Sequence, residues 1–249
     1  MTWTQIGWII IGLAAVLLAG LNVLIRGRKP YQVRENPALK RLQDHRVVAV
    51  ERGKGRQVIL GDSFWSHAYP GLGLHALSAL PGLVSPEDKG EGGQVVSTGS
   101  GALVLFAREI VQGRYQDGFS PDLQDRKLPV SLPGPTALSF TAGLLPELSM
   151  HTIGSLAMFG SFGMGAPLWA EAAYIKGGQV FAAAGSITAQ AALFLTVRDL
   201  LIGEEVFMLP GLLAPTAPNQ AAWLTEDILR VALMLLLIVA ATLKMAGLL

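Results

Sequence analysis

Residues 155–173 read SLAMFGSFGMGAPLWAEAA and belong to an uncharged interval, since no Asp, Glu, Lys or Arg lies between Glu147 and Glu171. Two structures fit such a stretch. It can form the middle of a membrane-spanning helix, or it can form a buried strand, a glycine turn and a helix of an α/β domain. The choice decides whether the chain is a four-span membrane protein or a folded domain with terminal anchors.

The Gly-Ser step of this stretch recurs after three other apolar runs, in QVILGDS (57–63), QVVSTGSG (94–101) and VFAAAGS (180–186). Glycine permits a tight turn at the carboxyl end of a strand, and Ser or Asp caps the N–H groups of the helix that follows. Strands that alternate with helices indicate a parallel sheet covered on both faces. We therefore predict an α/β domain with a mostly parallel sheet and helices on both faces.

The same reading gives the positions of the elements. The sequence predicts parallel strands near residues 57–60, 94–98, 129–132, 155–160, 179–184 and 199–203. A further strand at 46–52 is expected to pair with the first through the turn at 53–55. The polar stretches 85–93 and 113–129 are predicted to be exposed loops.

The aliphatic content of the chain supports this interpretation without excluding the other. Residues 148–170 hold four Leu, Ile or Val but four Gly and one Pro. Membrane helices that pack closely are also rich in small residues. A four-span alternative, with middle spans at 148–170 and 177–197, therefore stays open.

Both ends of the chain are predicted to be membrane anchors. Residues 6–25 contain twelve Leu, Ile or Val and no charge, which is enough length to cross a bilayer. Residues 26–56 carry ten Lys or Arg against three Asp or Glu, and the positive-inside rule places this side in the cytoplasm. Thr225 to Asp227 resemble a helix N-cap and an acidic first turn before a second apolar run.

The predicted organisation is a transmembrane helix at 1–26, a basic juxtamembrane linker at 27–45, a cytosolic α/β domain at 46–224 and a transmembrane helix at 225–249. We expect the bacterial plasma membrane as the location, with both termini outside. The basic segment is assigned to lipid headgroups. Nucleic acid is not expected as a partner, because the segment lacks interleaved aromatic residues.

Two motifs carry a resemblance to a known family. The stretch GSFGMGAPLWAEAAYIKGGQVFAAAGS (160–186), followed by RDLLIGEEVF (198–207), resembles an uncharacterised family of bacterial membrane-anchored proteins with a Rossmann-like cytosolic domain. The resemblance covers roughly residues 45–249 and implies a fold and a topology, but no activity. The matching positions are Gly160, Ser161, Phe162, Gly163 and Glu171 for the first motif and Ile202, Gly203, Glu204 and Glu205 for the second.

The common catalytic motifs are absent from the sequence. The chain has no cysteine, which excludes disulfides and thiolate chemistry. It also has no GxxxxGK[ST], HExxH or GxSxG motif. The string GLGLHA (71–76) matches GxGxxA, but it follows Tyr69-Pro70 instead of a strand, which favours a glycine-rich helix or loop. The sequence therefore predicts no cofactor, no metal site and no catalytic set.

A candidate ligand site follows from the predicted sheet. The carboxyl ends of parallel strands share one edge, so Ser63 and the serines of the other three turns should gather there. Helix N-termini at that edge suit a phosphate or a carboxylate, although Gly and Ser also belong in such turns for structural reasons alone. The candidate ligand-binding residues are Gly99, Ser100, Gly160, Ser161, Gly163, Gly185, Ser186, Glu171, Glu204 and Glu205.

The carboxylates of this set have a structural interpretation that we favour. Glu204 and Glu205 are expected to cap the next helix or to bridge to Arg198 or to a neighbouring subunit. Asp199 is expected to form a local ion pair with Arg198.

Three functions remain compatible with the sequence. The first is a membrane-anchored, non-enzymatic scaffold or assembly subunit, because the chain has two predicted anchors and no recognisable catalytic set. We expect it to form a homo-oligomer or to join a larger membrane complex, since Gly7, Gly12 and Gly20 permit close helix contacts. The second is a domain that binds a small anionic ligand or nucleotide at the Gly-Ser edge and is either enzymatic or not. The third is a four-span channel or transporter subunit.

Overall fold

The computed structural model describes residues 8, 11–12, 15–20, 23, 37–61, 71–84, 94–117, 130–150, 152–213 and 217–245. The chain divides into two compact units, one of residues 34–214 and one that combines residues 1–33 with 215–249. The first unit contains the sheet. The second contains the long C-terminal helix.

The sheet of the first unit is six-stranded and parallel throughout, with the order β3-β2-β1-β4-β5-β6. Each predicted parallel strand is confirmed to within two residues at either end. The order reverses between β1 and β4, which defines a doubly wound, Rossmann-like sheet. The strands are β1 (Gly55–Leu60), β2 (Gln94–Thr98), β3 (Val130–Ser131), β4 (Ile153–Gly160), β5 (Gln179–Ala184) and β6 (Asp199–Leu201).

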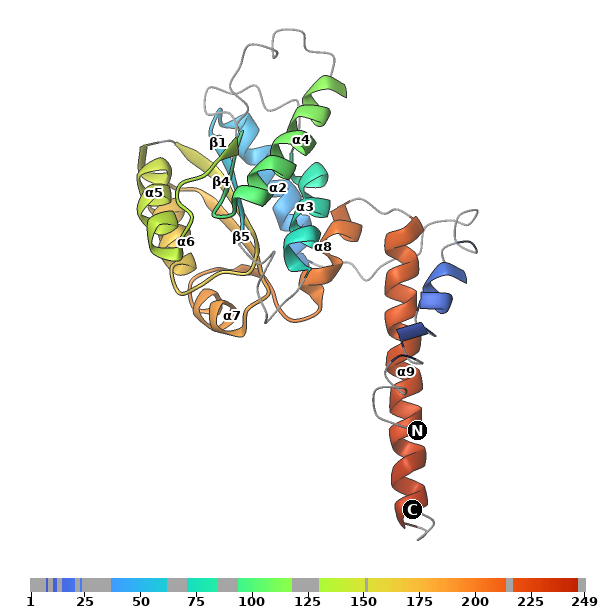
Figure 1. Cartoon of the computed structure of the whole chain (residues 1–249). Helices are drawn as coiled ribbons and strands as arrows, with labels where there is room; N and C mark the ends of the chain where they lie inside the picture. Colours follow the sequence, from blue (N-terminus) through green and yellow to red (C-terminus); the bar gives the residue numbers. More distant parts are fainter. Residues whose placement is uncertain are drawn as a thin grey trace. The chain divides into compact units, whose positions relative to one another are not determined.

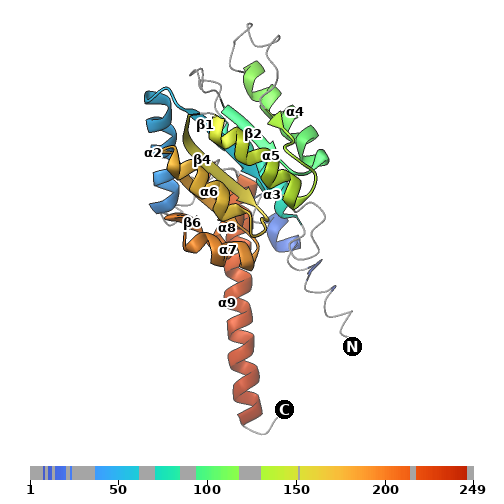
Figure 2. The same ribbon diagram turned by 90° about the vertical axis from the view of Figure 1, so that its left-hand side faces the viewer.

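Helices cover both faces of the sheet (Figures 1 and 2). One face packs against α2 (Pro37–Glu51), α3 (Leu72–Leu83), α4 (Gly101–Asp117) and α8 (Glu205–Leu213). The other packs against α5 (Ala137–Met150), α6 (Ala166–Ile175) and α7 (Ile187–Phe194).

Each central strand supplies side chains to both hydrophobic cores. On β1, Leu60 enters the core of the α2 face and Ile59 enters the core of the α5 face. On β4, Phe159 and Met158 divide in the same way. Because both faces are buried, these strands read as continuous apolar runs and not as an alternating pattern.

The two stretches of the four-span alternative are parts of this sheet. Residues 148–170 hold the end of α5, the whole of β4 and the start of α6, and residues 177–197 hold β5 and α7. Neither stretch is a single helix. The uncharged interval around residue 160 therefore reflects burial inside an α/β domain.

The predicted strand at 46–52 is wrong, because residues 46–51 form the end of α2 and residue 52 begins a turn. Leu39, Leu42, His45 and Ala49 are buried at spacings of three or four residues, which is the period of a helix. Pro37 opens the helix, a position at which proline is favoured. Part of the predicted linker at 27–45 is thus helical as well.

An ionic contact joins α2 to β6, an edge strand of the sheet. The side chain of Asp199, the first residue of β6, is 5% exposed and accepts a hydrogen bond from Nε of Arg41. His45 Nε2 lies 3.4 Å from the second oxygen of the same carboxylate. Burial lowers the pKa of His45 below its ordinary value, against the opposing effect of Asp199, so Arg41 is the main partner of this charge. The prediction that Asp199 pairs with Arg198 missed these contacts.

Helix α9 (Ala217–Met245) begins eight residues before the predicted start. Pro218 lies in its first turn, as expected at a helix start. Thr225 lies inside the helix and donates to the carbonyl of Ala221 at 2.7 Å, so the prediction of an N-cap there is wrong. Arg230 pairs with Glu226 one turn earlier, at 3.3 Å.

The structure does not confirm the two predicted membrane anchors. Within the described parts of the chain, no helix is long and apolar enough to cross a membrane. Much of the predicted span 6–25 and residues 246–249 lie outside the described residues. So do the predicted loop 85–93 and, beyond the end of α4, residues 118–129 of the other predicted loop.

Two glycines allow the ends of β1 and β4 to approach closely. Gly61 donates its N–H to the carbonyl of Phe159 at 2.8 Å, and the carbonyl of Gly160 accepts from Gly185 at 2.9 Å. Gly160 has a φ of 134°, and a Cβ at this position would lie 2.6 Å from the nitrogen of Gly61. Neither the backbone angle nor the space admits a side chain.

We predict that Gly160→Ala lowers the free energy of unfolding by about 3 kcal/mol, since it combines backbone strain with overpacking. Urea denaturation measures the change. Gly163→Ala is the matched control, because its φ is ordinary and a Cβ there meets no atom within 4 Å. Equal urea midpoints for the two variants would contradict the close approach of β1 and β4.

Candidate functional site: a cavity at the reversal of strand order

A cavity borders the carboxyl ends of β1 and β4, where the strand order reverses. From β1 the sheet continues to β2 and β3, and from β4 it continues to β5 and β6. In open parallel sheets, ligands bind in the crevice outside the strand ends at this reversal. The cavity has a volume of about 300 Å³, at the lower end of the range for small-molecule sites.

Segments from both halves of the sheet form its walls. Leu60 is the last residue of β1, Gly61 and Gly99 follow β1 and β2, and residues between 135 and 141 lie at the start of α5. The opposite side consists of residues 161–165, which form the turn after β4, and of Trp169 on α6.

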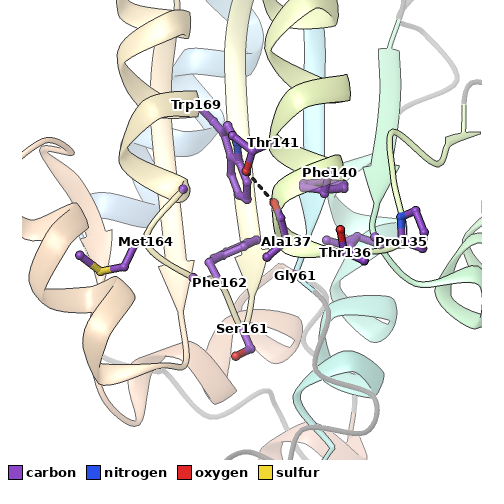
Figure 3. A pocket seen from close by; sticks show the side chains of 14 residues that line it. Gly61, Pro135, Thr136, Ala137, Phe140, Thr141, Ser161, Phe162, Met164 and Trp169 are labelled. Atoms are coloured by element: carbon purple, nitrogen blue, oxygen red, sulfur yellow. Dashed lines mark hydrogen bonds between the residues drawn. The ribbon is translucent and has the colours of Figure 1, made fainter.

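Three aromatic rings dominate the apolar part of the wall (Figure 3). The centroid of Trp169 lies 5.2 Å from that of Phe140 and 5.8 Å from that of Phe162, and both pairs are edge-to-face. The Trp169 indole is buried, and its Nε1 finds no hydrogen-bond acceptor among the described residues. Buried N–H groups are nearly always paired, so an unpaired donor at this position is unusual.

Side chains at the start of α5 cap the backbone N–H groups of its first turn. The Thr136 hydroxyl accepts from the N–H of Ser139 at 3.2 Å, and the Ser139 hydroxyl accepts from the N–H of Thr136 at 2.9 Å. This reciprocal cap satisfies two backbone donors. Thr141 Oγ1 donates to the carbonyl of Ala137 at 2.9 Å (Figure 3).

The start of α6 has few free donors as well. The N–H of Ala166 donates to the carbonyl of Gly163 at 3.3 Å, and that of Leu168 donates to Gly165 at 3.1 Å. Pro167, between them, has no N–H. The first turn of α6 is therefore largely satisfied by its own loop.

The described lining carries no ionisable side chain. Its polar groups are the hydroxyls of Thr136, Thr141 and Ser161 and the backbone of the glycines. The cavity thus has no pH-dependent charge of its own within the described residues.

The structure brings three of the predicted site residues to the cavity, namely Gly99, Ser161 and Gly163. Gly160 lies directly behind the turn and serves the contact with β1. The Ser161 side chain points away from the three rings (Figure 3). The predicted gathering of turns at one edge is therefore found, while Ser63 lies outside the described residues.

Other predicted residues have structural roles at the same edge. Ser186 caps α7 by accepting from Ala189 N–H at 3.3 Å, and its hydroxyl donates to the carbonyl of Phe162 at 2.7 Å. Gly185 makes room for the side chain of Leu72. Ser100 precedes α4, and its carbonyl accepts from Val104.

The predicted carboxylates do not line the cavity. Glu171, Glu204 and Glu205 are exposed. Glu205 lies in the first turn of α8, where the positive end of the helix stabilises a carboxylate. This position agrees with the capping role that the sequence favoured for the pair.

Sequence reasoning missed Gly61, Phe140 and Trp169. A signal for the first was present, since Gly61 ends an apolar run in the same way as Gly160. The two aromatic residues lie on helices and have the ordinary pattern of core positions. Their convergence depends on the order of the strands, which no local motif shows.

Among the described residues, no three His, Asp or Glu side chains lie close enough together to hold a metal ion. Comparison of the chain with protein-family models, curated proteins and solved structures gave no match. The family resemblance stays a prediction.

We predict that Ser186→Ala lowers the free energy of unfolding by about 1 kcal/mol, because the cap of α7 is lost. Ser161→Ala is the matched control with an expected change below about 0.5 kcal/mol, since no hydrogen bond of its hydroxyl is found among the described residues. The free energy of unfolding of both variants is measured by urea denaturation. A larger loss at Ser161 than at Ser186 would contradict these roles.

Proposed function

We propose that the 34–214 unit is a small-molecule-binding domain whose ligand occupies the cavity at the ends of β1 and β4. One observation carries the proposal: a cavity of ligand size coincides with the reversal of strand order, the place where open parallel sheets bind ligands.

The glycines of the wall support this proposal. Packing accounts for Gly61, whose Cβ would strike the backbone of Ser161, and for Gly165, whose Cβ would lie 2.7 Å from Thr141 Oγ1. Packing does not account for Gly163, which faces open space and has an ordinary φ. A glycine there keeps a wall of the cavity free of side-chain atoms.

We predict that Gly163→Leu abolishes ligand-dependent stabilisation and leaves the melting temperature of the free protein unchanged, because its side chain extends into open space. A ligand at one hundred times its Kd stabilises the wild type by about 2.7 kcal/mol. The measurement is a thermal shift against nucleosides, nucleotides, dinucleotides and aromatic amides, with Gly163→Ala as the control. A compound that stabilises the wild type and Gly163→Leu equally binds elsewhere and contradicts the assignment.

A second function is favoured by a separate observation on α9. Residues 233–238, which are Leu, Met, Leu, Leu, Leu and Ile, are each 55–65% exposed. Six consecutive residues cover all sides of a helix, so the apolar surface surrounds α9. We infer that the second unit attaches the protein to a membrane surface and supports a scaffold or assembly role there. Exposed basic residues such as Lys40 and Arg52 would add attraction to anionic lipids.

For this second function, we predict that Leu236→Glu weakens co-sedimentation with phosphatidylglycerol vesicles about tenfold or more, because a charge in an apolar membrane environment is costly. Leu105→Glu is the matched control, since Leu105 on α4 is 69% exposed. Equal binding of both variants and the wild type would exclude α9 as the lipid contact.

A further inference from the structure

The helices that cover one face of the sheet are apolar on their solvent side as well as on their buried side. Helix α6 contacts both α5 and α7 in front of the sheet (Figure 2). Among the described residues of this layer, six large aliphatic or aromatic side chains are between 55% and 85% exposed, namely Leu138 on α5, Leu168 and Ile175 on α6, and Ile187, Phe194 and Leu195 on α7 and at its C-terminus. We call this surface the α5–α7 face.

Charged residues are scarce in the same layer. Between residues 137 and 197 the sequence holds three Asp, Glu, Lys or Arg residues, which are Glu147, Glu171 and Lys176. Glu147 is half-buried and accepts hydrogen bonds from serine hydroxyls on β2 and β3 at 3.3 and 3.4 Å. The exposed charges of the α5–α7 face are therefore Glu171 and Lys176.

The helices of the opposite face have a different solvent side. Leu105 and Phe106 of α4 are exposed, but the exposed Arg108 and Glu109 follow them within one turn. Exposed charges of both signs also lie on α2. Such a mixture is typical of a surface that stays in contact with water. The apolar solvent side is thus a property of one face of this domain.

A lipid surface does not fit the α5–α7 face. Anionic headgroups attract clusters of Lys and Arg, whereas Lys176 is the one basic residue between 137 and 197. Glu171 lies one turn from both Leu168 and Ile175 on the exposed side of α6. If these two side chains entered hydrocarbon, the carboxylate would enter with them, at a high cost in free energy. A protein surface can offer hydrogen-bond donors to such a group.

The size and composition of the face suit a contact between two copies of the chain. A large apolar side chain has on the order of 100 Å² of apolar surface, so six side chains that are 55–85% exposed present on the order of 450 Å². A standard interface buries about 800 Å² per partner, and in homodimers about 65% of this area is apolar. The exposed apolar surface is therefore close to what one side of a homodimer interface supplies.

We propose that the α5–α7 face is the interface of a homodimer, in which the helical layers of two copies pack against each other about a two-fold axis. A two-fold axis brings the same patch of both copies together, so apolar side chains meet apolar side chains and no partner of opposite charge is required. The proposal is independent of the cavity and of the lipid contact of α9.

The first test is the mass of the full-length protein in mild detergent, measured by analytical ultracentrifugation over a series of concentrations. We expect a dimer, and we expect Phe194→Glu to raise its dissociation constant about tenfold or more, because a charge is then buried on both sides of the interface. Leu105→Glu is the matched control, since the two side chains are 68% and 69% exposed on opposite faces of the sheet. A wild type that stays monomeric at its highest soluble concentration would overturn the proposal.

The second test locates the contact by cross-linking. The chain has no cysteine, so single cysteines can be introduced without a background. Ala172→Cys on α6 and Ala102→Cys on α4 replace alanines of similar, intermediate exposure. A bismaleimide is added to each full-length variant in lipid vesicles. We expect a covalent dimer from Ala172→Cys, and cross-linking of this variant that is no greater than that of Ala102→Cys would overturn the proposal.

Other occupants of the α5–α7 face give different results. If Phe194→Glu remains as dimeric as the wild type, the copies meet through another surface, such as that of α9. If Phe194→Glu instead weakens co-sedimentation with phosphatidylglycerol vesicles as Leu236→Glu is expected to do, the face contacts lipid. Either result overturns the proposal, while the thermal shifts of Gly163→Leu test the cavity separately.

Discussion

The close approach of Gly61 and Gly160 is the constraint on which the domain depends. Their backbones meet with no room for a Cβ, and this contact joins β1 to β4 at the centre of the sheet. The next helices that the structure describes, α3 after β1 and α6 after β4, cover opposite faces of the sheet. Because α3 and α6 lie on opposite faces, a crevice opens between the ends of β1 and β4. A structural requirement of the fold and the candidate binding site thus have one origin.

The chemistry of the cavity differs from what the turn sequences suggest. Gly-Ser turns before helices are typical of anion sites because they leave backbone N–H groups free. In this domain the local structure uses those groups, through the cap at Thr136 and the loop hydrogen bonds at α6. Ser186 is likewise engaged, with Phe162. The repeated Gly-Ser pattern therefore encodes turns, while the aromatic wall of the cavity consists of Phe140 and Trp169 on helices and of Phe162 in the turn after β4.

The sequence predicted the strands well because each is an apolar run that stops at a turn signal. It failed at α2, where Val47, Val48 and Val50 resemble a strand but the burial of Leu39, Leu42 and Ala49 follows a helical period. It found the turns of the site through their glycines. It did not find the aromatic wall, because Phe140 and Trp169 are separated along the chain and become neighbours only through the order of the strands. That order is a global property, and no short motif in this chain specifies it.

The central position of β1 also has a consequence for how the chain acquires its structure. The first neighbour of β1, the strand β2, follows it closely in the sequence, whereas its second neighbour, β4, comes only after β3 and α5. During synthesis from the N-terminus, β1 therefore presents an unpaired apolar edge until β4 emerges. Such edges are templates for pairing with other chains, and long-range parallel pairing is slow. The period before β4 is available is thus the stage at which this protein is most vulnerable to aggregation.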